Sequence, residues 1–279
     1  MKYLVIILLT TLFQPSAFSQ ENSNLSSLEK ELCEIQYSLY ELRHTFNGNT
    51  EDDNSYIDRL DSLQLQFEKS LYKLLYLDST YKYEFTEIQK KDCRVIKSFD
   101  NKLRIFTQNT FQGGSNPMFC SYIQYVSKNT NHIQKMNGYS DPGYEYNMIY
   151  SIGNASQNLY LLSGITLIAN CYFSEILQAI SFKNQTFVKE KIFNTNDIFT
   201  DYLAISYQDF EEDATSYINE SSKPCKILYN YRTKSIYKPI IKLTNGIEYI
   251  SNEGTIYKEI INKDNNILFI NDRLKHNKH

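Results

Sequence analysis

The chain has 279 residues, of which 42% are hydrophobic and 22% are charged, a composition typical of a globular protein. Lysine and arginine total 29 against 32 aspartate and glutamate residues, which gives a formal net charge of −3. A nucleic-acid-binding surface needs clustered lysine and arginine, and the longest uninterrupted basic run is the pair Lys90-Lys91. We therefore expect no nucleic acid as a partner.

Residues 1–19 have the pattern of a signal peptide. Lys2 supplies a positive charge, an apolar stretch of about ten residues ends at Phe13, and Ala17-Phe18-Ser19 is a small-x-small cleavage pattern. This stretch is too short to cross a hydrocarbon core of about 30 Å as a lasting anchor. The sequence predicts export to the periplasm or the extracellular space, with no transmembrane anchor after cleavage. The alternative is a buried N-terminal strand or helix.

Residues 20–90 are predicted to form a helical hairpin. Leucine and isoleucine recur at three- and four-residue steps between Leu25 and Leu42, and a second such run extends from Ile57 to Leu75. Ser23 or Asn24 is a candidate N-terminal cap of the first helix. Residues 47–49, Asn-Gly-Asn, interrupt the pattern because glycine and asparagine tolerate left-handed backbone angles at a helix end.

Residues 91–272 are predicted to form a β domain, followed by a polar tail, 273–279. Short alternating runs rich in Ile, Tyr, Phe, Val and Thr replace the helical period after Cys93, and many are joined by tight-turn residues. Sequential strands joined in this way pair antiparallel. The predicted fold class is thus α+β, an N-terminal helical hairpin followed by a mostly antiparallel β-meander. A curved sheet, a sandwich and a propeller-like arrangement all remain open.

A hairpin near the start of the β domain resembles one from an uncharacterised family of secreted bacterial proteins. The matching residues are Ser98-Phe99-Asp100-Asn101-Lys102-Leu103-Arg104, followed by a Gly-Gly loop. The family pattern is Ser-x-Asp-x-Lys-Leu-Arg and then a Trp-Asp-Thr and Gly-Gly-Thr loop. Here Gln108 and Asn109 replace the Trp and Asp, and Ser115 replaces the last Thr. The resemblance implies export and a helix-then-sheet layout, and it implies no established activity.

The same hairpin provides the candidate ligand-binding residues. Lys102 and Arg104 lie two apart on a predicted strand, so both side chains are expected on one face, with Asp100 at the turn able to pair with either cation. Gly113 and Gly114 form a loop that would close over this patch. The interpretations are an anion-binding or substrate-binding patch, or a solvated strand face with a surface salt bridge.

Other chemistry gives little signal. Cys33, Cys93, Cys120, Cys171 and Cys225 are widely scattered, which leaves open up to two disulfides or five small buried side chains. Neither the cysteines nor the four histidines have metal-ligand spacing, so no metal and no cofactor are expected. Three Ser-x-x-Lys tetrads, including Ser235–Lys238, lack the companion motifs of penicillin-recognising enzymes.

Two functions are compatible with these features. The first is an exported, non-catalytic module that binds an unknown protein, glycan or small molecule. The chain has 24 tyrosines, 16 phenylalanines and no tryptophan, and exposed Tyr rings stack on sugars or proteins, although Tyr is also a favoured strand residue. The alternative is an exported hydrolase that acts on glycans through two carboxylates about 5–10 Å apart. The absence of a catalytic motif favours binding.

Overall fold

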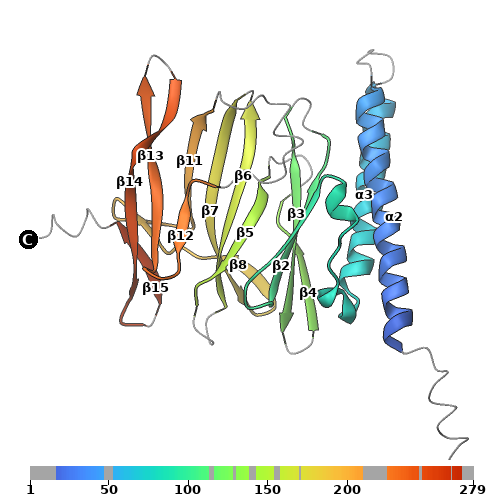
Figure 1. Ribbon diagram of the computed structural model, residues 1–279, viewed down its shortest axis with the longest axis horizontal. Coiled ribbons are helices and arrows are strands. Elements are labelled where there is room, and N and C mark those ends of the chain that lie inside the picture. Colours follow the sequence, from blue (N-terminus) through green and yellow to red (C-terminus); the bar gives the residue numbers. More distant parts are fainter. Residues whose placement is uncertain are drawn as a thin grey trace, which may run out of the picture. The chain divides into compact units, whose positions relative to one another are not determined.

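The computed structural model describes residues 17–46, 53–112, 116–127, 130–137, 143–153, 158–169, 171–209, 225–244, 247–264 and 266–271. The chain divides into two compact units, Met1–Lys91, which is helical, and Asp92–His279, which consists of strands (Figure 1). The predicted fold class, a helical hairpin followed by mostly antiparallel strands, is confirmed. Most of the predicted signal peptide, 1–16, and the polar tail lie outside the described residues.

The helical unit contains α2 (Ala17–Thr45), α3 (Asp53–Leu75) and two short 3-10 helices, η1 (Asp78–Lys82) and η2 (Ile88–Lys90). Apolar side chains at three- and four-residue steps make the two long helices pack along their buried stripes. These buried side chains are Leu25, Leu28, Leu32, Leu39 and Leu42 of α2 and Leu60, Phe67, Leu71, Leu74 and Leu75 of α3. Ser23 and Asn24 lie inside α2, so the expectation that either caps its start is wrong.

A buried carboxylate ties the helical hairpin to the segment that follows it. Glu29 of α2 is 1% exposed. Its side chain accepts hydrogen bonds from the Tyr83 hydroxyl at 2.6 Å and from the backbone amides of Glu87 and Ile88 at 2.8 and 3.0 Å. The amides belong to the start of η2, where backbone donors lack partners within the helix. Glu29 therefore fixes η2 on α2.

The strands of the second unit form three sheets. Sheet A contains β1 (Cys93–Lys97), β2 (Leu103–Asn109), β3 (Phe119–Ser127) and β4 (Thr130–Lys135) in that order. Sheet B has the order β11-β7-β6-β5, with β8 also paired to β7; its strands are β5 (Glu145–Ser151), β6 (Leu159–Ala169), β7 (Tyr172–Lys183), β8 (Thr186–Lys189) and β11 (Tyr202–Gln208). Sheet C has the order β10-β9-β15-β14-β13-β12; its strands are β9 (Phe193–Thr195), β10 (Ile198–Thr200), β12 (Leu228–Asn230), β13 (Ser235–Thr244), β14 (Ile247–Ile261) and β15 (Ile267–Asn271).

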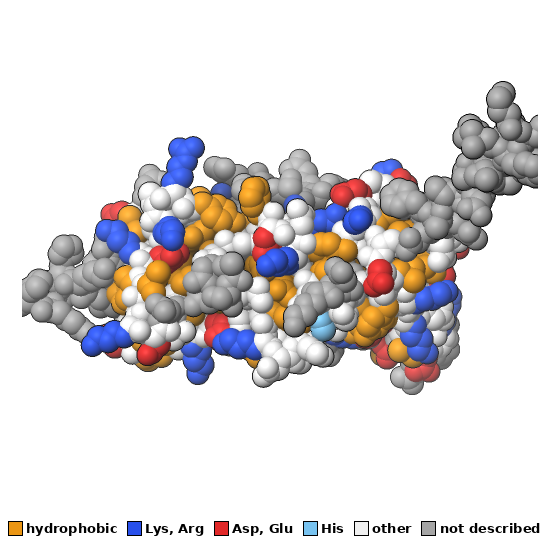
Figure 2. Space-filling view, turned by 90° about the horizontal axis from the view of Figure 1, so that it is seen from below, with side chains coloured by type: hydrophobic (Ala, Val, Ile, Leu, Met, Phe, Trp, Pro, Cys, Tyr) orange, Lys and Arg blue, Asp and Glu red, His pale blue; other side chains and the backbone are white. Residues whose placement is uncertain are grey.

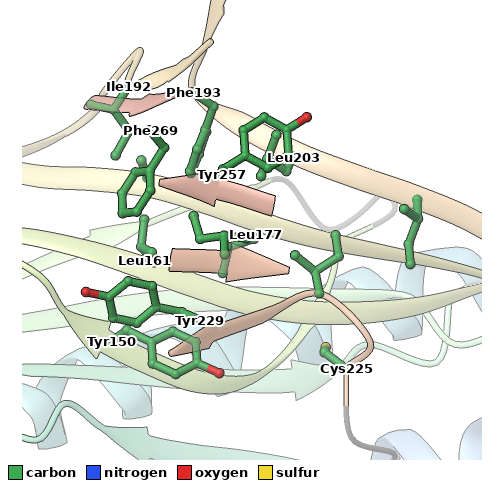
Figure 3. Close-up of a cluster of buried hydrophobic side chains, with 14 of the residues drawn as sticks. Tyr150, Leu161, Leu177, Ile192, Phe193, Leu203, Cys225, Tyr229, Tyr257 and Phe269 are labelled. Atoms are coloured by element: carbon green, nitrogen blue, oxygen red, sulfur yellow. The ribbon is translucent and has the colours of Figure 1, made fainter. Parts of the chain in front are cut away.

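Sheet B is the middle layer of this unit, because it is buried on both faces. Residues of β6 and β7 are buried almost without interruption. Leu161 and Leu177 face a core shared with sheet C, whereas Leu162 and Ile176 face a core shared with sheet A. Figure 3 shows the core between sheets B and C, where the rings of Tyr150 and Tyr229 meet edge to face at 5.4 Å. The strands thus form a three-layered sandwich.

The strand pattern differs from the sequence prediction in a few places. Strand β9 pairs with β15 in parallel, an exception to the antiparallel pattern. Strand β14 is continuous over 15 residues, whereas short strands joined by tight turns were expected. Polar residues and Gly254 resemble a turn there, but a Cβ at Gly254 would overlap the ring of Tyr237 on β13. Glycine is needed for this close approach within a strand.

None of the five cysteines forms a disulfide; three of them are buried and two are partly buried. The sequence left open either up to two disulfides or five small buried side chains, and the structure contains no disulfide. The thiols of Cys93 and Cys120 belong to sheet A, where both residues pair with Gln108 from opposite sides. One intervening strand therefore separates these two cysteines, which is too far for a disulfide.

Candidate functional site

An open groove lies between the edge of sheet B and the inner face of sheet C. Its volume is about 440 Å³, within the roughly 300–1,000 Å³ of ligand-binding pockets. Strands β7, β11, β13 and β14 line it, and we call it the β11–β13 groove. The lining residues are Tyr172, Ala204, Ile205, Ser206, Lys238, Pro239, Ile240, Ile241, Glu248, Thr255 and Tyr257.

Lys238 is the distinctive residue of this groove. Two residues before it, Ile236 is fully buried in the core between sheets B and C and pairs with Tyr257. Side chains two apart on a strand share a face, so Lys238 and its pairing partner Thr255 continue the inner face of sheet C beyond that core. A cation thus occupies a position where the strand pattern calls for an apolar side chain.

The Lys238 ammonium has no counter-ion in the described part of the chain. Burial lowers its pKa, because removing the ammonium from water disfavours the charged form, and no neighbouring charge contributes to the shift. The acid of the groove, Glu248, accepts a hydrogen bond from the Tyr172 hydroxyl at 2.5 Å instead. The Glu248 amide donates to Gln208 at 3.3 Å, which fixes this end of the groove to β11. The groove therefore presents one partly desolvated positive charge.

Of two other cavities, one has its carboxylate engaged by neighbouring side chains and the other lies between the two long helices. One, of about 380 Å³, lies between β6, β7, β15 and the segment 190–192 that follows β8, and its Glu190 accepts from both Lys183 and the Ser181 hydroxyl. The other, of about 490 Å³, lies between α2 and α3 and contains Glu41 and Arg59. Each of these three cavities in the described structure contains one carboxylate. The pair that glycoside hydrolysis needs is absent from them.

The most buried cluster of ionisable groups is structural in character. Glu175 of β7 is fully buried and accepts from the Tyr207 hydroxyl at 2.7 Å and from the amides of Lys226 and Ile227 at 2.5 and 3.3 Å. Burial raises its pKa. Nearby, burial and then Glu175 raise the pKa of the Cys225 thiol to about 11. A buried thiol with such a pKa is a poor nucleophile. The cluster holds segment 225–227 on the middle sheet.

The structure separates the residues predicted as a ligand patch. Asp100 accepts from the Ser98 hydroxyl at 2.6 Å, from the Lys102 amide at 3.2 Å and from the Tyr160 hydroxyl at 2.9 Å. It forms no ion pair with a described residue. This turn ends at Lys102, which is exposed, and β2 begins only at the next residue. Lys102 is exposed whereas Arg104 is buried, so the two side chains do not form one accessible patch, and their shared strand face stays a prediction.

Arg104 is 1% exposed and donates to the Gln124 side chain at 3.3 Å on the neighbouring strand. Gly113 and Gly114 lie outside the described residues, so the closing loop stays a prediction. Sequence reasoning singled out Lys238 only as part of a Ser-x-x-Lys tetrad. Two features of the sequence could have identified Lys238 as a candidate. It is a lysine at an inward-facing position of a strand, and it directly precedes Pro239, where the register between β13 and β14 shifts.

Comparison with known proteins finds no matching family model, no matching curated protein and no matching solved structure. Within the described residues, no group of three or more His, Cys, Asp or Glu side chains is placed to hold a metal ion. The helices described here also lack an apolar segment long enough to cross a membrane. Figure 2 shows a face on which acidic and basic side chains are interspersed. The β11–β13 groove is thus the site with the clearest binding chemistry.

Proposed function

We propose that this protein is an exported, non-catalytic binding module that holds an anionic group of its ligand on Lys238 in the β11–β13 groove. One observation carries the proposal: a lysine on the inner face of a sheet, partly removed from water, lacks a counter-ion among the described residues. Burying a charge is costly unless it is paired. A carboxylate or phosphate from a ligand would supply the missing partner.

The exported setting rests on the signal-peptide pattern of residues 1–19 and on the resemblance of the Ser98–Arg104 hairpin to secreted bacterial proteins. Glycan hydrolysis by two carboxylates receives no support from the three cavities described above, each of which has one acid. Binding is therefore the function that the groove supports best.

Thermal unfolding of the mature chain tests this proposal with three probes: D-galacturonate, N-acetylglutamate and inorganic phosphate. A probe that binds with a Kd of about 1 mM stabilises the protein by about 1.4 kcal/mol at about 10 mM, which raises Tm by roughly 3–5 °C. We expect such a rise with at least one probe. It should disappear in Lys238→Gln and persist in Lys189→Gln, which removes an exposed lysine from β8.

The proposal is wrong if none of the three probes raises Tm, or if Lys238→Gln responds as the wild type does. An independent readout is the Lys238 pKa, measured by NMR of the ¹³C-methylated protein. It should lie below the usual lysine value in the free protein and rise when the probe binds, because an adjacent anion favours the ammonium.

A further inference from the structure

One wall of the β11–β13 groove is an open strand edge. Strand β11 ends sheet B and, among the described strands, pairs only with β7. Directly after β11, the Asp209 amide donates to the Cys171 carbonyl at 2.8 Å. Antiparallel strands exchange backbone hydrogen bonds at every second residue, so the odd-numbered residues of β11 bond to β7. The backbone amides and carbonyls of Ala204 and Ser206 therefore point away from sheet B, and no described residue bonds to them.

The opposite wall is also an open edge. Strand β12 pairs with β13 only from Ser235 to Tyr237. From Lys238 onward β13 pairs with β14 alone among the described strands, and β11 lies near its other edge without pairing with it. Consecutive residues of both edges, 204–206 and 238–241, line the same groove. Exposed strand edges are normally blunted or covered, because unpaired backbone groups attract further strands.

We propose that the groove binds an extended peptide segment of a partner protein, which adds to β11 as a further strand and places a carboxylate on Lys238. This inference rests on the proposed function, since it names the ligand class of the same site. Strand addition uses the backbone for affinity and side-chain pockets for specificity.

Two features favour an acidic peptide over other anions. The open donors and acceptors of Ala204 and Ser206 repeat every two residues, the repeat of an extended polypeptide, and a sugar has no such alternation. Charge complementarity supplies the acidic character, because Lys238 lacks a described counter-ion while Glu248 is engaged by Tyr172. A second copy of this chain is the competing occupant, and its own β11 would then fill the groove.

The probes are fluorescein-labelled heptapeptides with alternating threonine and valine, in which a single glutamate occupies each of the five inner positions in turn. Binding to the full mature chain is followed by fluorescence anisotropy. We expect one glutamate position to bind best, because the register of a strand is fixed by its pairing. Replacing that glutamate by glutamine should weaken binding several-fold. Methylating the alternate amides that face β11 should weaken it about tenfold or more, whereas methylating the other set should have a smaller effect.

Two variants test the same contacts from the side of the protein. Ala204→Pro removes an outward-pointing amide from an edge strand, where proline is tolerated, and should abolish binding. Lys238→Gln should match the effect of the glutamine peptide, and Lys189→Gln should bind normally. If Ala204→Pro does not fold, as judged by circular dichroism, the methylated peptides give the same answer without a variant.

The outcomes separate the two proposals. If no heptapeptide binds, or if both methylated peptides bind like their parent, strand addition is wrong; a Lys238-dependent rise in Tm with the small anions would still support the proposed function. If peptides bind equally to Lys238→Gln, the assignment of Lys238 as the anchor is wrong in both proposals. A concentration-dependent dimer in sedimentation experiments that Ala204→Pro abolishes would show that a second copy fills the groove, and would overturn the peptide assignment.

Discussion

Removal of the Glu175 carboxylate should be among the most destabilising single changes in the β unit. Glu175 lies on the middle sheet and faces sheet C, fully buried. It is the acceptor for one side-chain donor, the Tyr207 hydroxyl, and for two backbone donors, the amides of Lys226 and Ile227. Alanine at this position leaves all three donors without their acceptor inside the protein.

The expected cost follows from the number of these donors. A buried donor that loses its acceptor costs about 1–3 kcal/mol, so loss of the acceptor of three donors in Glu175→Ala should lower the free energy of unfolding by about 3–9 kcal/mol. Tyr207→Phe removes one hydroxyl that bonds to a carboxylate and should cost about 1.5–3 kcal/mol by itself. In the Glu175→Ala background the same change should cost almost nothing, because the hydroxyl has already lost its acceptor. The coupling free energy is then about 1.5–3 kcal/mol.

Chemical denaturation followed by far-UV circular dichroism measures all four proteins of this cycle. Glu253→Ala is the matched control, since it removes an exposed carboxylate that pairs with Lys242 at 3.1 Å and should change stability by less than about 1 kcal/mol. The reasoning fails if Glu175→Ala is as mild as Glu253→Ala. It also fails if the effects of Glu175→Ala and Tyr207→Phe simply add.

Three further predictions concern other parts of the chain. Burial and the hydrogen bond to Glu29 raise the pKa of Tyr83 to about 12. The stabilisation that the neutral Tyr83 hydroxyl provides is therefore present below pH 10 and lost as the pH rises toward 12. Denaturation midpoints of the wild type should decrease over this pH range, and those of Tyr83→Phe should decrease less steeply. Gly254→Ala should destabilise by about 1–3 kcal/mol through overlap with the Tyr237 ring, and much less in a Tyr237→Ala background, as measured by denaturation. With a pKa of about 11, roughly one Cys225 thiol in a thousand is ionised at pH 8, so iodoacetamide should leave Cys225 unmodified in the native protein and modify it in denaturant, as peptide mass spectrometry would show.

The general layout was predictable because hydrophobic periodicity reports which side of an element is buried. The leucines of α2 and α3 repeat with the helical period, and β11 alternates between buried and less buried residues. Strand β6 has a nearly continuous apolar run, and β7 is buried almost throughout although it includes Ser, Glu and Gln, since both faces of these strands are covered. A strand that is buried on both faces can be assigned to a middle layer only when the sheets that cover its two faces are known. The stacking of three sheets was therefore beyond the sequence alone.

The groove was not predictable for a related reason. A conspicuous motif drew attention to Asp100 and Arg104, whose side chains bond within the domain. Lys238 belongs only to a Ser-x-x-Lys tetrad that lacks its companion motifs. Its significance comes from facing β11, more than thirty residues earlier in the chain. Open backbone groups, such as those of Ala204, carry no sequence signature, because they depend on which strand ends a sheet.

The tyrosine-rich composition has a structural explanation in the hydroxyl group. Five tyrosines donate to carboxylates at least 30 residues away in the sequence: Tyr83 to Glu29, Tyr160 to Asp100, Tyr172 to Glu248, Tyr207 to Glu175 and Tyr229 to Glu259. A hydrogen bond to a charged group contributes about 1.5–3 kcal/mol, comparable to the low end of a disulfide. Such pairs tie distant segments together in a chain whose five cysteines remain thiols. One of them, Tyr172 with Glu248, also engages the acid of the β11–β13 groove, so among the described residues no acid of that groove pairs with Lys238.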